Sequence, residues 1–465
     1  MVNSTTPENK HKTLKFFLSA IGLLLCFVLI FSCFSRLLVH PEDDRSYSMI
    51  KGFYEEEKGS LDAVFIGSST SYADWNQLVA WHEYGITAYT FTSPAQPLFA
   101  AEYMCKEARK TQPDALYIFN LMTMVEYFEK DQFFGFHALI DYMPLSLNRL
   151  QLSKALCDNM GYDYSENLEY FIPLVRYHDQ WENFDGAQFH KKADGVKGTA
   201  HYGKFLRDTK DLNGTFYSTD KTLPFKKDTK VIEKCVNSLL DYLKKENVNA
   251  LFITAPTTGK DEKIYQYINT AEEMVKKAGF PVLDFQNQSF LENEMGIDVR
   301  RDFYNTSHFN IHGNLKSTKY LSEYLIKNYG FKNKRNDKSY KAGKSWDEAY
   351  EKYINYLLPF TLEPEYTLKT EKGFFCPKIY SQTAPDGSVT LSWGKAEGAD
   401  GYAVYRKDGD KVPYQKIAEG EMTSCSYTEK PEKGKTYTYL VIAYKGEGEN
   451  RTWSSYYSYG ASVKL

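Results

Sequence analysis

The longest apolar run of the chain lies close to its N-terminus. Residues 14–39 are almost wholly apolar, and Lys10, Lys12 and Lys15 lie at the start of the run. About 20 apolar residues are enough to cross a bilayer, and a positive flank stays in the cytoplasm. We therefore predict a cytoplasmic tail at 1–13, a single transmembrane anchor at 14–39, and the rest of the chain outside the cell. A cleaved signal peptide is the alternative, but the run is too long for one and no small-residue cleavage site follows it.

Short apolar runs alternate with helical periodicity over residues 40–330. We expect strands at 63–66, 115–119, 250–254 and 282–285, and helices at 100–109, 231–245, 264–278 and 311–328. Strands that alternate with helices predict an α/β domain, with a parallel sheet and helices on both of its faces. The pattern breaks at residues 126–223, which are polar, aromatic and too long for a plain loop. We interpret this stretch as an insertion that caps the domain.

The character of the chain changes again toward its C-terminus. Residues 331–376 are rich in lysine and glutamate with one helical stretch, and are predicted to be a linker with a helix. Residues 377–465 contain short runs that alternate with period two between glycine and aspartate turns, which predicts an antiparallel β-sandwich. This segment resembles a fibronectin type III domain, with Trp393 as core tryptophan and Tyr437 at the tyrosine-corner position. We expect it to fold alone and to take no part in any chemistry.

Composition narrows the class of partner. The formal net charge is −3, and nucleic-acid binding would need a basic patch or stripe, so we expect no nucleic acid. The chain has 38 tyrosines, which suits contact with sugar rings, although a tyrosine-heavy β domain would give the same composition. The seven cysteines have the spacing of neither a disulfide framework nor a metal site. We predict no metal and no cofactor.

Two distant motifs carry the candidate chemistry. Gly67-Ser68-Ser69 follows the apolar run 63–66, and a strand that ends in Gly-x-Ser can hold a serine hydroxyl at the carboxyl edge of a parallel sheet. Far downstream, His308 follows within a turn-rich stretch. An early serine and a late histidine are a layout that a serine hydrolase can use.

The order and spacing of these motifs resemble the SGNH (GDSL-type) hydrolase and acyltransferase superfamily over residues 60–330. The resemblance implies a flavodoxin-like three-layer domain, with Ser69 as nucleophile and His308 as general base. The family has an aspartate three residues before the histidine, but here Asn305 stands in that place. Asp302, six residues before His308, is the other candidate, and we predict that it is the acidic partner of the imidazole.

The same resemblance implies an oxyanion hole. It would consist of the Asn120 side chain and the backbone N–H of Ser69. The family also uses a glycine N–H, but the corresponding stretch around Ala95 has no glycine.

The layout is similar to membrane-anchored SGNH-like proteins of Firmicutes, including the one that takes part in D-alanine transfer to teichoic acids. By that resemblance the chain is a serine esterase or O-acyltransferase acting on a cell-wall or surface polysaccharide, with a multi-pass membrane acyltransferase as partner. The alternative is a catalytically inactive SGNH fold that binds glycans or assembles the cell envelope. Asn305 and the missing glycine favour that alternative.

Overall fold

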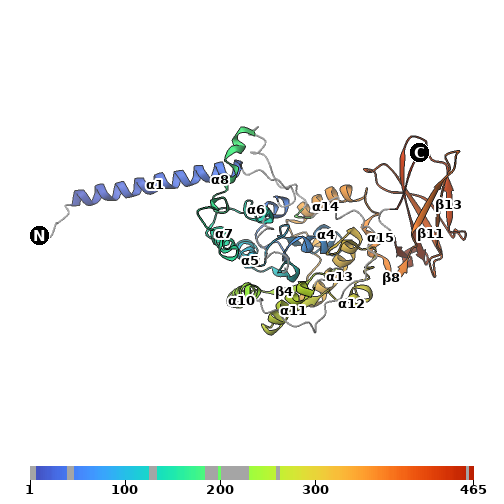
Figure 1. Ribbon diagram of the computed structural model, residues 1–465, viewed down its shortest axis with the longest axis horizontal. Helices are drawn as coiled ribbons and strands as arrows, with labels where there is room; N and C mark the ends of the chain where they lie inside the picture. The colour runs from blue at the N-terminus through green and yellow to red at the C-terminus, as the bar shows by residue number, and fades with distance from the viewer. Residues whose placement is uncertain are drawn as a thin grey trace.

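The molecule has three parts in a row: a long N-terminal helix, an α/β domain and a C-terminal region of strands (Figure 1). This computed structural model describes residues 7–38, 47–124, 134–183, 197–199, 230–257, 262–456 and 460–465. Residues 1–6 of the expected cytoplasmic tail and most of the expected insertion beyond residue 183 lie outside the described residues.

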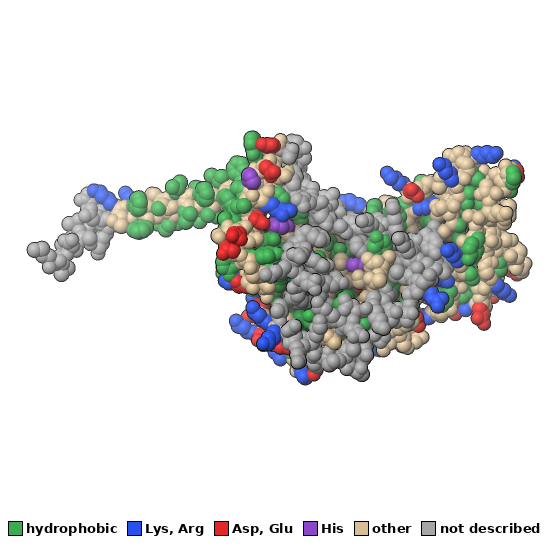
Figure 2. All heavy atoms as spheres, viewed as in Figure 1, with side chains coloured by type: hydrophobic (Ala, Val, Ile, Leu, Met, Phe, Trp, Pro, Cys, Tyr) green, Lys and Arg blue, Asp and Glu red, His purple; other side chains and the backbone are tan. Residues whose placement is uncertain are grey.

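Helix α1 (Pro7–Leu38) contains the apolar run. Its stretch His11–Phe34 has a mean hydropathy of 2.7 and is not buried by the rest of the protein. Twenty-four residues at about 1.5 Å per residue extend roughly 36 Å, more than the roughly 30 Å of a bilayer core. By length and composition this helix can cross a membrane, and Figure 2 shows hydrophobic side chains along it.

The α/β domain is built on five parallel strands in the order β2-β1-β3-β4-β5. The strands are β1 (Ala63–Ile66), β2 (Ala88–Thr90), β3 (Leu116–Asn120), β4 (Ala250–Thr254) and β5 (Val282–Asp284). Strand β1 pairs with β2 on one side and with β3 on the other. The chain therefore reverses its direction of progress at β1, and ligands of such sheets bind beyond the carboxyl ends of the strands at this point.

Helices cover both faces of the sheet, as the alternation of strands and helices predicted. Side chains at alternate positions of β1 belong to different cores: Val64 packs in one cluster and Phe65 in the other. The first core includes α5 (Ala100–Arg109), α10 (Lys230–Lys245) and α11 (Glu262–Lys277). The second includes α12 (Gln288–Asn293) and α13 (Ile311–Tyr329). Two short helices, α3 (Ser69–Asp74) and α4 (Gln77–Tyr84), follow β1.

The described part of the expected insertion is helical. Its elements are α6 (Phe134–Ile140), α7 (Leu147–Met160), η3 (Leu168–Tyr170), α8 (Pro173–Tyr177) and η4 (His178–Asn183). Helix α7 packs against α5, whereas α8 and η4 contact α1 (Figure 1). This part of the insertion therefore joins the α/β domain to the end of the apolar helix.

The segment 331–376 packs closely on its neighbours. It contains η6 (Lys334–Asn336), α14 (Gly343–Leu357), α15 (Pro364–Leu368) and β8 (Thr370–Phe375). The rings of Trp346 and Trp81 lie 6.0 Å apart, and Asn76 Nδ2 donates to the Tyr353 hydroxyl at 2.6 Å. Helix α14 thus belongs to the core of the α/β domain, and β8 already belongs to the C-terminal sheet.

The C-terminal region consists of two packed sheets whose strands pair mainly in antiparallel fashion. One has the order β13-β10-β9, and the other the order β12-β11-β14-β15-β8 with β16 beside β14. The strands are β9 (Ile379–Thr383), β10 (Val389–Trp393), β11 (Gly401–Asp408), β12 (Gln415–Gly420), β13 (Ser426–Glu429), β14 (Thr436–Lys445), β15 (Thr452–Ser455) and β16 (Ala461–Lys464). Trp393 packs 5.3 Å from Tyr402 in the core between the sheets, and the Tyr437 hydroxyl donates to the Glu432 carbonyl at 3.3 Å.

Candidate active site

Ser69 lies at the carboxyl end of β1, at the point where the strand order reverses. The strand ends at Ile66, two residues follow, and Ser69 is the first residue of α3. Ser68 is extended, with φ −104° and ψ −156°. Its carbonyl accepts the N–H of Ser71 at 3.0 Å, which closes the first turn of the helix. The Ser69 side chain is half-buried at this edge of the sheet.

A short hairpin brings His308 to the serine. It consists of β6 (Phe303–Asn305) and β7 (His308–Phe309), which pair antiparallel directly before α13. Asn310 caps α13, because its Oδ1 accepts the N–H groups of His312 and Gly313 at 3.0 and 3.2 Å. With the hairpin held in this way, His308 Nε2 lies 2.7 Å from Ser69 Oγ. The catalytic roles of the two residues stay a prediction.

Asn305 sets the tautomer of the imidazole. Its Oδ1 lies 3.1 Å from the backbone N–H of Ser307 and 2.8 Å from His308 Nδ1. A backbone N–H can only donate, so this oxygen is the acceptor end of the amide. It therefore accepts a hydrogen bond from the N–H of His308 Nδ1. The proton of the neutral ring is then on Nδ1, so Nε2 is free to accept a hydrogen bond from the Ser69 hydroxyl.

Asp302 does not take the place that the sequence led us to expect. Its carboxylate lies 2.7 Å from Lys316 Nζ and accepts the backbone N–H of Asp298 at 2.6 Å. The carboxylate is directed to α13, since Lys316 is a residue of that helix. The Nδ1 side of His308 belongs to Asn305 instead, so the acidic partner predicted for the imidazole is a neutral amide.

Burial shapes the electrostatics of His308. Its ring is enclosed, and desolvation lowers the pKa from 6.5 to about 4, because burial disfavours the charged form. The imidazole is therefore neutral at ordinary pH and available as a proton acceptor. Asn305, which contacts Nδ1, is a neutral amide, so it would not stabilise by charge the imidazolium formed during proton transfer.

Asn120 lies close to the serine but its amide is partly engaged. It is the last residue of β3, its Nδ2 donates to Thr70 Oγ1 at 3.0 Å, and its Oδ1 accepts from Met122 N at 3.0 Å. Thr70 directly follows Ser69, so the amide is adjacent to the candidate nucleophile. One of the two N–H groups of the amide is therefore used by Thr70.

Ala95 has a left-handed backbone conformation in the stretch that lacks a glycine. Its φ of 53° lies in the left-handed region, which glycine adopts far more readily than alanine. The backbone here thus has the conformation of a glycine while carrying a methyl group.

Several residues near the site escaped the sequence analysis. Lys316 and Ser455 support the histidine hairpin. Lys316 Nζ binds Asp302, which directly precedes the hairpin, and lies 3.0 Å from Ser455 Oγ of the C-terminal region. Asp74, at the end of α3, is fully buried, and burial raises its pKa well above the usual range. A lysine in an amphipathic helix and a serine in a strand give no local signal of such contacts.

Among the described residues, no cluster of His, Cys, Asp and Glu is arranged to hold a metal.

The C-terminal region, which we expected to fold alone and to take no part in the chemistry, contacts the back of the histidine hairpin. His312 packs edge-on against Tyr456, with ring centroids 4.6 Å apart, and Arg301 Nη1 lies 3.4 Å from the Ser455 carbonyl. These side chains contact the support of the hairpin, whereas the reacting atoms of Ser69 and His308 belong to the α/β domain.

Comparisons with known proteins say little about this site. No protein-family model matches the chain, and no curated protein matches it. Among solved structures, an Fn3-like protein from Clostridium thermocellum is 26% identical, with 20% of this chain and 92% of that chain covered and a TM-score of 0.17. The structure of FN3tt mut is 23% identical, with 19% of this chain and 96% of that chain covered and a TM-score of 0.16. These weak Fn3-like neighbours extend over a small part of the chain, so function has to be argued from the geometry of the site.

Proposed function

We propose that the chain is a membrane-anchored SGNH-type esterase or O-acyltransferase that modifies a cell-envelope glycan through Ser69. The observation that carries the proposal is the relay from Ser69 Oγ to His308 Nε2 at 2.7 Å and from His308 Nδ1 to Asn305 Oδ1 at 2.8 Å. Its position supports the proposal too, since the strand order 2-1-3-4-5 is flavodoxin-like and places the relay at the switch point of the sheet.

In the proposed reaction, Ser69 Oγ attacks the carbonyl carbon of an acyl donor while His308 Nε2 takes the hydroxyl proton. The tetrahedral oxyanion is bound by the Ser69 N–H and the remaining N–H of Asn120. Collapse expels the donor's alcohol, which takes the proton from Nε2, and leaves the acyl group on Ser69. A glycan hydroxyl or water then attacks this ester while His308 Nε2 takes its proton. Collapse breaks the bond between the acyl group and Ser69 Oγ, and Oγ takes the proton back from Nε2.

The apolar helix α1 supports an envelope substrate. We propose that it spans the membrane with its basic N-terminal flank in the cytoplasm, so that the α/β domain faces the outside. A tethered enzyme samples polymers at its own membrane, and a tether adds little against free small molecules. A polysaccharide acceptor and a multi-pass acyltransferase as acyl donor are the partners proposed on this basis.

A second candidate is a catalytically inactive module that binds glycans. Two observations favour it: the neutral Asn305 in the relay, and the Asn120 amide that donates to Thr70. An inactive module would keep its glycan affinity when Ser69 is changed, because no covalent step depends on the hydroxyl.

A fluorophosphonate probe distinguishes the two, since it labels a serine only when a base activates it. We expect the full-length protein in detergent to be labelled, and Ser69→Ala to abolish the labelling. Ser71→Ala is the matched control, because Ser71 is in the same helix and its hydroxyl has no partner among the described residues. An unlabelled wild-type protein that still sediments with purified cell walls would support the inactive module and refute the enzyme.

A further inference from the structure

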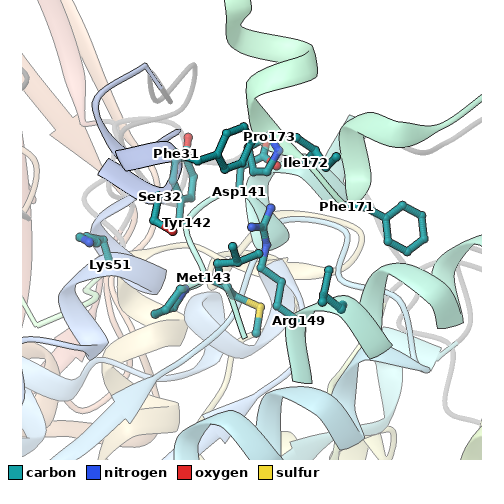
Figure 3. A pocket seen from close by; sticks show the side chains of 13 residues that line it. Phe31, Ser32, Lys51, Asp141, Tyr142, Met143, Arg149, Phe171, Ile172 and Pro173 are labelled. Carbon is teal, nitrogen blue, oxygen red and sulfur yellow. The ribbon is translucent and has the colours of Figure 1, made fainter. Parts of the chain in front are cut away.

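A pocket of about 500 Å³ lies where the apolar helix meets the α/β domain (Figure 3). Phe31 and Ser32 of α1 form one side, and residues of α7, α8 and the loops before them form the other. The walls are mostly apolar, with Tyr142, Met143 and Ile172 among them. The pocket is thus a hydrophobic chamber of the size that holds small ligands, and one of its walls belongs to the helix proposed to be in the membrane.

A buried arginine with two unpaired guanidinium nitrogens lines this chamber. Arg149 is 3% exposed, and its Nε and Nη2 have no hydrogen-bond acceptor in the part of the chain that the structure describes. Figure 3 shows the guanidinium group rising into the middle of the pocket. Burial lowers its pKa. Buried donors without acceptors are costly, so the guanidinium group would gain from contact with an anionic ligand.

An acidic residue of the lining shares the pocket with the arginine. Asp141 Oδ2 lies 3.0 Å from His137 Nδ1 and accepts the Tyr177 hydroxyl at 2.8 Å, whereas Oδ1 has no hydrogen-bond partner among the described residues. Attraction to Asp141 raises the pKa of Arg149 by less than burial lowers it, and the two side chains form no ion pair at contact distance among the described residues. Lys51 also lines the pocket, so the lining has two cations and one carboxylate.

The surface around the pocket is apolar in a way that suits a membrane. Large hydrophobic side chains are exposed on α7, α8, η4 and the turns beside them: Leu145, Leu147, Leu150, Leu168, Ile172, Val175 and Trp181. Trp181 is 64% exposed, and tryptophan is enriched at the level of lipid headgroups. Phe31 and Ser32 lie close to the end of the apolar stretch at Phe34, which places the pocket at the same level.

We propose that this pocket binds the phosphate headgroup of an anionic phospholipid from the bilayer that α1 crosses, with Arg149 as the principal contact. The guanidinium supplies parallel N–H donors for phosphate oxygens, and the apolar wall accepts the upper part of an acyl chain. The proposal rests on the membrane anchoring proposed above but not on the chemistry of Ser69. Bound lipid would fix the α/β domain against the membrane surface.

Native mass spectrometry of the full-length protein, released from detergent with phosphatidylglycerol or phosphatidylcholine, tests the proposal. We expect phosphatidylglycerol to be retained roughly tenfold to a hundredfold better, the range for one or two charge-assisted hydrogen bonds. Arg149→Met should lose this preference. Lys154→Met is the matched control, because Lys154 is an exposed cation of the same helix and should keep the preference.

The melting temperature gives a second, independent readout. Without lipid, Arg149→Met should melt at or above the wild-type temperature, since it removes an uncompensated buried charge. A lower melting temperature would mean that Arg149 is a structural residue and would overturn the proposal, as would equal retention of the two lipids by the wild type. If inorganic phosphate competes with phosphatidylglycerol at millimolar concentration, the ligand is a soluble anion and the lipid assignment is wrong. Fluorophosphonate labelling of the same samples reports on Ser69 separately, so failure of the pocket and failure of the chemistry are distinguishable.

Discussion

Lys316 Nζ lies 2.7 Å from the carboxylate of Asp302, and the two side chains are 5% and 1% exposed. The pair joins α13 to the turn just before the hairpin that carries His308. Lys316 Nζ also contacts Ser455 Oγ at 3.0 Å, so a residue of the C-terminal region completes the support. The position of His308 against Ser69 therefore depends on a polar contact among three segments that are far apart in the sequence.

Removing one member of the Lys316–Asp302 pair should destabilise the protein more than removing both members. Lys316→Met leaves the Asp302 carboxylate buried without a cation, which costs about 3–5 kcal/mol in comparable cases. We expect a clear fall in melting temperature and in fluorophosphonate labelling. The double variant Asp302→Asn, Lys316→Met should recover most of the stability, because no charge is then left unpaired. An unchanged melting temperature in the single variant would contradict the structural role of the pair.

Loss of only the third partner should have a milder effect. Ser455→Ala removes one acceptor from Lys316, which costs about 1.5–3 kcal/mol for a hydrogen bond to a charged group. Ser462→Ala, at an exposed position of strand β16, is the matched control. Slower labelling in Ser455→Ala than in Ser462→Ala would show that the C-terminal region helps to position the hairpin.

Replacing the amide of the relay by a carboxylate should accelerate the reaction. In Asn305→Asp the new charge stabilises the imidazolium of His308, and the tautomer is kept because the side chain still accepts from Nδ1. We expect the labelling rate at pH 8 to rise roughly tenfold to a hundredfold, less than for enzymes in which the amide also imposes the wrong tautomer. Asn305→Ala should lower the rate. Labelling that is equal in all three proteins would mean that position 305 does not act on His308.

The pH dependence of labelling should be unusually acidic. Only neutral His308 can accept the Ser69 proton, and its pKa is lowered to about 4. The rate should stay constant from pH 8 to about pH 5 and fall by half near pH 4. The folded protein itself loses stability as the pH falls below about 6.5, because the unfolded chain takes up this proton first. Short labelling pulses with tryptophan fluorescence as a check on folding separate the two effects, and a midpoint near 6.5 would contradict the prediction.

The buried carboxyl group of Asp74 should make the stability of the protein fall as the pH rises. The raised pKa of Asp74 means that the folded state holds its proton while the unfolded state releases it, so stability falls as the pH rises above about 4. Asp74→Asn keeps the shape and removes the ionisation. Its gain in melting temperature over the wild type should be larger at pH 8 than at pH 5, and Asp241→Asn on the exposed side of α10 should show no such trend.

The sequence was informative where a local pattern determines the structure. The apolar run 63–66 followed by Gly67 was enough to place Ser69 at the carboxyl edge of the sheet. Strand and helix periodicities predicted the parallel sheet with helices on both faces, and the N-terminal run predicted a helix able to cross a membrane. In each case the signal lies in one continuous stretch of the sequence and reflects which side chains avoid water.

Contacts between distant segments left no such signal. Asp302 and Asn305 are both close to His308 in sequence. The contact of His308 Nδ1 with Asn305 follows from the hairpin, in which Asn305 and His308 are paired. The carboxylate of Asp302 is bound by Lys316, which in sequence looks like a solvated position of an amphipathic helix. Ser455 lies 139 residues after Lys316 in the sequence. The alternating pattern of its strand predicts a sheet but does not indicate that Ser455 contacts Lys316.

The relay of Ser69, His308 and Asn305 carries no formal charge at rest. A hydroxyl, a neutral imidazole and an amide neither attract nor repel an ionic polymer over a distance, so these three side chains give no electrostatic steering. These three side chains alone therefore do not distinguish an anionic from a neutral ligand before contact. Any dependence of association on ligand charge or on added salt would come from other charged residues of the protein.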